Sequence, residues 1–177
     1  MDPLVEVAVA RLGLDGSSNT YVVILREKDG DRILPIWIGQ PEAESILLEI
    51  NSVRKERPLT HDLCKSLIVG LGATLQRVNI TRVEHRTYYA ELHLARDGEL
   101  YQVDARPSDS IAIALRTASP IYASESLLLD PPDEADDDDD TVVPPTELPQ
   151  STEEMSAEQL KQYLAGLRPE DFGKFNP

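Results

Sequence analysis

The sequence repeats one order of local patterns: strand-like segments joined by a polar turn, a dipeptide that ends in proline, and an apolar helix. Gly39-Gln40-Pro41 precedes the first such helix, and Ala105-Arg106-Pro107 precedes another 66 residues further on. An X-Pro pair favours extended backbone and proline suits the first helical turn, so each tripeptide marks a strand-to-helix junction. The pattern predicts an α+β fold, built either from a duplicated strand-rich unit or with two unrelated junctions of a common kind.

The alternation of apolar and polar residues predicts a mixed or antiparallel sheet with about three helices. Extended segments are expected at residues 4–14, 21–25, 33–38, 74–83, 87–95, 100–105 and 120–122. Helices are expected at residues 42–52, 60–70 and 108–117. Trp37 is expected in the core. A stripe of leucines that recur every four residues should be buried along the second helix: Leu59, Leu63, Leu67 and Leu71.

Negative charge is concentrated near the C-terminus. Residues 1–129 contain 18 acidic and 14 basic side chains, whereas residues 130–177 contain 14 acidic and 3 basic ones. We expect a folded domain at 1–129, a disordered acidic Pro/Asp-rich linker at 130–151, and a short amphipathic helical tail at 152–177. Such a helix is marginal alone, so it should dock on its own body, on a second subunit or on another protein. Its apolar stripe consists of Leu160, Tyr163, Leu164 and Leu167.

The composition of the 177 residues is that of a soluble protein without a membrane segment. No apolar run approaches the roughly 20 residues that cross a bilayer, and the amino terminus lacks the basic region of a signal peptide. The single cysteine, Cys64, is expected to be an inert thiol on the second helix. We therefore expect a cytoplasmic location. The net charge of −15 excludes a globally basic nucleic-acid-binding surface, although not a local basic patch.

The first polar cluster lies at the second strand-to-helix junction. Ser108 is placed to cap the helix, and Asp109 in its first turn is favoured by the helix dipole. Capping does not explain Asp104 at the end of the preceding strand. Asp104, Asp109 and Arg106 could together hold a divalent cation against a phosphate, which is the arrangement that phosphodiester hydrolysis requires.

The second polar cluster, Thr60-His61-Asp62, lies at the start of the second helix. Thr60 and Asp62 suit a cap and a first turn, which is the structural interpretation. The functional interpretation rests on His61, because an imidazole beside a carboxylate suits general acid–base chemistry. No two histidines stand at a metal-ligand spacing, so a zinc site is not expected.

The third polar segment is the loop between the first two strands. Its small polar residues suit a tight turn, or else bring backbone amides to a phosphate, with Asp15 and Asn19 beside the ligand. Motifs typical of nucleotide cofactors are absent, so no organic cofactor is indicated.

Three segments together resemble the bifunctional nuclease domain family: LGLDGSSNTYVVILREKDGDRILPIWIGQPEAESI, RPLTHDL and VDARPSDSIAIALR. The resemblance covers residues 5–128 and implies a mixed fold with a curved sheet, self-association into a homo-oligomer, and cleavage of DNA and RNA. Ser110 departs from the family pattern, which more often has alanine there. The polar positions of the motif are intact here: Asp15, Asn19, Glu42, Glu44, Arg57, His61, Asp62, Asp104, Arg106, Ser108 and Asp109.

The leading hypothesis is a sequence-nonspecific nuclease acting on DNA and RNA with Mg²⁺ or Mn²⁺. Asp104 and Asp109 would hold the metal with help from Asp62. Arg106 would neutralise the phosphate and His61 would move a proton. The alternative is a non-catalytic, self-associating scaffold or regulatory module that binds a small anion or a partner protein. The slightly acidic body and an aromatic content of 5% favour this alternative.

Overall fold

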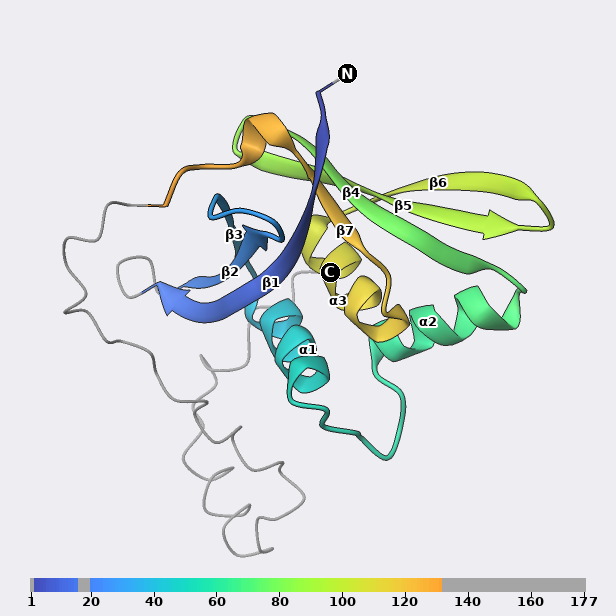
Figure 1. The fold of residues 1–177 in the computed structure, drawn as a ribbon. Helices are drawn as coiled ribbons and strands as arrows, with labels where there is room; N and C mark the ends of the chain where they lie inside the picture. Colours follow the sequence, from blue (N-terminus) through green and yellow to red (C-terminus); the bar gives the residue numbers. More distant parts are fainter. Residues whose placement is uncertain (1, 16–19, 132–177) are drawn as a thin grey trace, which may run out of the picture. The chain divides into compact units, whose positions relative to one another are not determined.

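The computed structural model describes residues 2–15 and 20–131. They form one mixed sheet with helices, as predicted (Figure 1). The elements in chain order are β1 (Leu4–Asp15), β2 (Thr20–Glu27), β3 (Ile33–Ile38), α1 (Gln40–Ile50), α2 (Thr60–Gly70), β4 (Thr74–Glu84), β5 (Thr87–Arg96), β6 (Glu99–Ala105), α3 (Pro107–Thr117), β7 (Ile121–Ser124) and the short 3₁₀ helix η1 (Glu125–Leu127). The predicted linker and tail helix lie outside the described residues.

The sheet has the strand order β3-β2-β1-β7-β4-β5-β6. Every neighbouring pair is antiparallel except β4 and β7, which are parallel. Each flank therefore consists of three consecutive antiparallel strands followed by a helix, with α1 after β3 and α3 after β6. β7 lies between the two flanks, so the last strand in the sequence joins both halves of the sheet.

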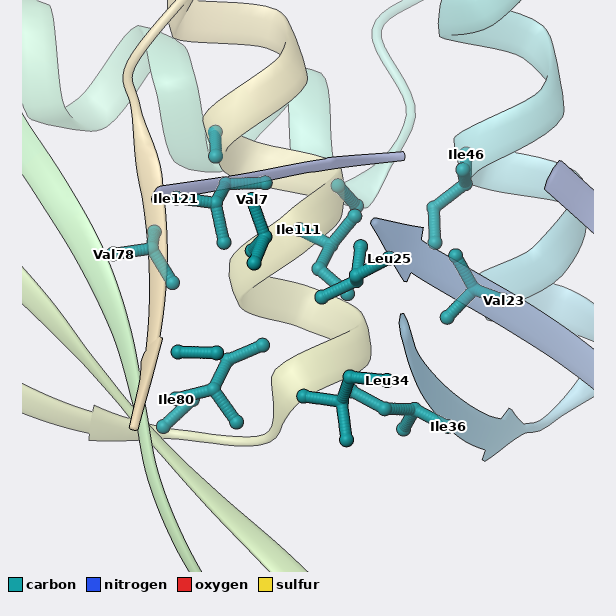
Figure 2. Close-up of a cluster of buried hydrophobic side chains, with 14 of the residues drawn as sticks. Val7, Val23, Leu25, Leu34, Ile36, Ile46, Val78, Ile80, Ile111 and Ile121 are labelled. Atoms are coloured by element: carbon teal, nitrogen blue, oxygen red, sulfur yellow. The ribbon is translucent and has the colours of Figure 1, made fainter. Parts of the chain in front are cut away.

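The core lies between this sheet and the helices on one of its faces (Figure 2). Alternate side chains of β2 and β4, such as Val23, Leu25 and Ile80, are completely buried. Ile46 of α1 and Ile111 of α3 pack against them from the helical layer. Burial of a side chain of this size contributes roughly 1.5–3 kcal/mol, so these contacts fix α1 and α3 on the sheet.

The leucine stripe of α2 is exposed, contrary to the sequence prediction. Leu59, Leu63, Leu67 and Leu71 all face solvent, and His61 is the one fully buried residue of this helix. A period of four identifies residues that share a face but does not say what the face contacts. Here the adjacent face, with Cys64 and Ile68 partly buried, contacts the core.

Trp37 is also exposed rather than in the core, with 51% of its surface accessible. Leu34, Ile36 and Ile38 alternate into the core along β3, so Trp37 points to the other face of the sheet. Its indole Nε1 donates a hydrogen bond to Oδ2 of Asp15 at 3.1 Å. The family motif around Trp37 therefore places an aromatic side chain on the face of the sheet away from the helices.

The helix starts differ from the predicted caps. Ser108 and Thr60 lie within the first turns of α3 and α2, whereas the N-cap positions are Arg106 and Leu59. Pro107 occupies the first helical position of α3 and thereby starts the helix one residue before Ser108. At α2 the N-cap is one residue before the predicted Thr60, and the Asp62 carboxylate of the first turn accepts the Leu59 backbone N–H at 2.9 Å.

Ser110 provides a test of the packing around α3. It is fully buried and its hydroxyl has no hydrogen-bond partner among the described residues. We expect Ser110→Ala to raise the free energy of unfolding by about 1 kcal/mol beyond the gain in helix propensity, because it removes an unsatisfied buried polar group. Urea denaturation measures the difference.

Ser66→Ala is the matched control, since Ser66 is an exposed serine within α2. Both substitutions gain the same helix propensity, but Ser66→Ala also removes an exposed hydrogen bond from the Ser66 hydroxyl to the Asp62 carbonyl at 2.9 Å, so Ser110→Ala should stabilise the protein more. Equal changes in the two variants would show that the Ser110 hydroxyl is satisfied in solution.

Candidate functional site

The candidate site is a polar network where the three α-helices meet. His61, in the first turn of α2, links the other two helices through both nitrogens of its ring. Nδ1 lies 2.7 Å from Oγ of Ser45 on α1, and Nε2 lies 3.0 Å from Oδ1 of Asp109 on α3. The histidine side chain is only 11% exposed, so the network crosses the interior of the helical layer.

The outer end of the network is Arg106, the N-cap residue of α3. Its Nε donates to Oδ2 of Asp109 at 2.8 Å, and its Nη2 donates to Oε1 of Glu42 at 2.8 Å. The Glu42 side chain is folded over Gly39, where a Cβ atom would collide with it. The two carboxylates hold a guanidinium whose side chain remains 66% exposed.

Arg116 makes a second, buried connection among the same helices. Its side chain is 3% exposed and its Nε donates to Oδ1 of Asp62 at 2.6 Å. The other guanidinium nitrogens donate to the carbonyl oxygens of Ala112 and Ser45, at 3.0 and 3.2 Å. Asp62, predicted as a catalytic acid, therefore anchors α2 through an ion pair and through the Leu59 amide.

The charges of the network are mutually stabilised. Burial alone would raise the pKa of Asp109, but hydrogen bonds from Arg106 and His61 outweigh it, and the pKa is lowered. The pKa of Asp62 is lowered in the same way, with Arg116 outweighing the effect of burial. Asp109 is thus a carboxylate at neutral pH and can only accept, which places a proton on Nε2 of His61.

Asp104 lies apart from this network. Val103 and Ala105 face the helix side of the sheet, in register with Leu92 and Ala90 of the core. Asp104 alternates with them and pairs with Glu91, so it points to the opposite face. No interaction within residues 2–15 and 20–131 joins it to Asp109.

The remaining predicted residues are dispersed. Asp15 ends β1 and binds the Trp37 indole, while Asn19 lies outside the described residues. Ser108 is buried in the first turn of α3. A shallow cavity at the start of α1 adjoins Gly39 and is lined by Leu14, Thr20, Tyr21, Ile38, Gly39 and Gln40.

The predicted metal site is not assembled by the described residues. Asp104 points to the face of the sheet away from the helices, whereas Asp109 lies on α3 in the helical layer, and Asp62 is bound to Arg116. In the described ranges no three histidine, cysteine or acidic side chains converge as metal ligands.

Sequence reasoning missed two members of the network, Ser45 and Arg116. Arg116 could have been identified from the sequence. It follows the apolar helical segment Ile111–Leu115, and a charged side chain in such a position needs either a buried partner or contact with solvent. Ser45 could not, since a serine inside an amphipathic helix is ordinary. Glu42 was recognised as a motif position but not as a partner of Arg106.

Comparison with known proteins connects this geometry to a family. The model of the family described as Bifunctional nuclease domain matches residues 23–132. The chain belongs to the bifunctional nuclease domain family. All of the network described above falls within the matched region.

Relatives divide into two groups. An uncharacterized protein of Mycobacterium tuberculosis is 43% identical over 167 residues, covering 94% of this chain and 97% of its own length. Bifunctional nuclease 1 of Oryza sativa subsp. japonica is 31% identical over 120 residues, 66% of this chain and 36% of its own. Bifunctional nuclease 2 of Arabidopsis thaliana is 29% identical over 109 residues, 59% of this chain and 33% of its own. The relatives with nuclease names are thus much longer proteins that share the domain.

The charge of Asp109 can be tested through the pH dependence of stability. Its lowered pKa provides stability above about pH 4, and this stability is lost as the pH falls through the folded-state value. At pH 7 we expect Asp109→Asn to lower the free energy of unfolding by roughly 1–3 kcal/mol, because Arg106 and His61 lose a charged acceptor. The difference in the free energy of unfolding between Asp109→Asn and the wild type should shrink as the pH falls below about 4, because Asp109 becomes protonated in the wild type.

Urea titrations at several pH values measure the effect, and Asp97→Asn is the control. Asp97 is an exposed turn carboxylate with a left-handed backbone conformation that asparagine tolerates. A difference for Asp109→Asn that does not change with pH would show that the carboxylate is not preferentially ionised in the folded protein.

Proposed function

We propose that this chain is a nuclease that hydrolyses phosphodiester bonds of DNA and RNA without sequence preference. The observation that supports the proposal is the state of Arg106. Its guanidinium is exposed at a helix start, two carboxylates fix its orientation, and Nη1 has no partner within the described part of the chain.

An oriented guanidinium suits a phosphate. Arginine binds phosphate oxygens through parallel N–H donors, and a donor that is held in place stabilises charge that develops in the transition state. The backbone of nucleic acids presents the same phosphate at each linkage, so recognition through Arg106 would not depend on base sequence.

Asp109 and His61 would act beside the bound phosphate. The carboxylate of Asp109 is 29% exposed and lies next to Arg106, where it could orient a water molecule and accept its proton. That water attacks phosphorus, the bond to the leaving sugar oxygen breaks, and this oxygen takes a proton from solvent. Both nitrogens of His61 are engaged, so His61 is a positioning residue for Asp109 in this arrangement.

The role of Arg106 predicts a specific pattern of variants. Arg106→Ala should reduce cleavage of labelled single-stranded DNA and RNA by about 100-fold or more, since it removes the charge that faces the phosphate. Arg106→Lys should recover only part of the rate, because lysine keeps the charge and loses the fork. Rates are measured on both substrates at equal ionic strength.

The matched control is Arg26→Ala, because Arg26 is an exposed arginine on β2 that also pairs with a carboxylate, that of Asp31. It should cleave as the wild type does. Wild-type activity per milligram should also stay constant through successive columns. Full activity in Arg106→Ala, or activity that separates from the protein, would overturn the proposal.

Metal dependence is a separate arm of the same assay. Loss of cleavage with EDTA and recovery with Mg²⁺ or Mn²⁺ would mean that a divalent ion takes part, held by one or two carboxylates together with the substrate phosphate or by residues outside the described ranges. Unchanged cleavage in EDTA would leave the reaction to the Arg106–Asp109–His61 network.

One observation favours a second candidate, a non-catalytic module that binds a small anion through Arg106. Every polar atom of the His61 ring is occupied, and Asp62 is committed to Arg116. Binding of a short oligonucleotide that requires Arg106, without any cleavage by purified protein, would support this module over the nuclease.

A further inference from the structure

The two edges of the sheet differ. At the β3 edge, Ile33 exchanges two backbone hydrogen bonds with Leu129, both 2.8 Å long, so the segment after η1 covers the start of that edge. β6 forms the other edge, at the upper right of Figure 1. Within residues 2–15 and 20–131 no backbone group pairs with its outer side.

β6 has few of the features that keep edge strands apart, since its only charged side chains are Glu99 and Asp104. Its sequence, ELYQVDA, contains no proline and no lysine, and its register with β5 runs without a bulge. Leu100, Tyr101 and Val103 are all exposed on it. An uncovered regular edge with apolar side chains is a template for pairing with another strand.

A second group of exposed apolar side chains lies on α2, on the helix side of the sheet. Tyr101 and Val103 face the helix side of the sheet, in register with Leu94 and Leu92. On that same side α2 exposes Leu63 and Leu67. Exposed apolar side chains in such number are typical of a surface that is covered by a partner.

We propose that β6 pairs antiparallel with β6 of a second copy of this chain, around a twofold axis at Gln102. Antiparallel pairing of two identical strands around this residue would place Tyr101 opposite Val103 of the partner subunit. The acidic residues would not oppose each other, because Glu99 would lie opposite Ala105 of the partner subunit and Asp104 opposite Leu100 of the partner subunit. A pairing of identical patches is the usual form of a homodimer interface.

A strand pair of seven residues is small for a stable interface, which usually buries more than about 1,000 Å². The exposed leucines of α2 provide further apolar area on the helix side, which a second folded subunit can cover. The dimer would therefore join two sheets at their β6 edges and leave the β3 edges outermost.

Sedimentation velocity on the full chain tests the proposal. The wild type should have twice the mass of one 19.7 kDa chain at micromolar concentration. Val103→Lys should shift it to the monomer. Val83→Lys is the matched control, because Val83 is a strand valine with 43% exposure against 41% for Val103, and it should remain dimeric.

A cross-link tests the axis independently of any loss of folding. In a Cys64→Ser background, Gln102→Cys should form a covalent dimer on oxidation, since the two copies meet at this residue. Gln76→Cys, exposed on β4, should not. A wild type that stays monomeric up to about 100 μM overturns the proposal, as does a dimer in which the two cysteine variants cross-link equally.

Discussion

The arrangement of the helical layer depends on the buried guanidinium of Arg116. It touches all three α-helices, through Asp62 of α2, a carbonyl of α1 and a carbonyl of its own helix. A charge at this depth is stable only while its partners are present, and removal of one partner of such a pair typically costs about 3–5 kcal/mol. Because α2 buries little apolar surface, this ion pair and His61 fix its position. The orientation of Asp109 and Arg106 follows from that position.

As a consequence, the same short segments contain both residues that hold the fold together and residues of the proposed site. Neighbouring residues of α2 serve different ends, since Asp62 anchors the helix whereas His61 holds Asp109. Membership of the bifunctional nuclease domain family is shown by the match over residues 23–132. Several polar residues of the family motif hold the helices together, so their presence does not by itself indicate catalysis. For this reason the main support for the proposed activity is the exposed guanidinium of Arg106.

The sequence predicted the elements well because strand alternation and X-Pro junctions are local signals. It predicted the convergence of His61, Arg106 and Asp109 only as a possibility, since two of them are 48 residues apart in the chain. It failed where orientation mattered. The spacing of apolar residues in α2 and β3 correctly predicted which side chains share a face. It did not indicate that the leucine face of α2 and the Trp37 face of β3 point away from the core. Asp104 illustrates the same limit, because one residue along a strand reverses the side of the sheet.

The position of β7 also has a consequence for how the chain acquires its structure. The two flanks of the sheet are local meanders, but the strand between them is synthesised after all the other strands of the described residues. Its pairing with β1 joins residues more than 110 positions apart, for example Val7 and Ile121. Contacts of this separation slow folding, because the chain loses entropy before they form. Each half-sheet therefore emerges from the ribosome with one side unpaired, and the protein becomes a single cooperative unit only when β7 arrives.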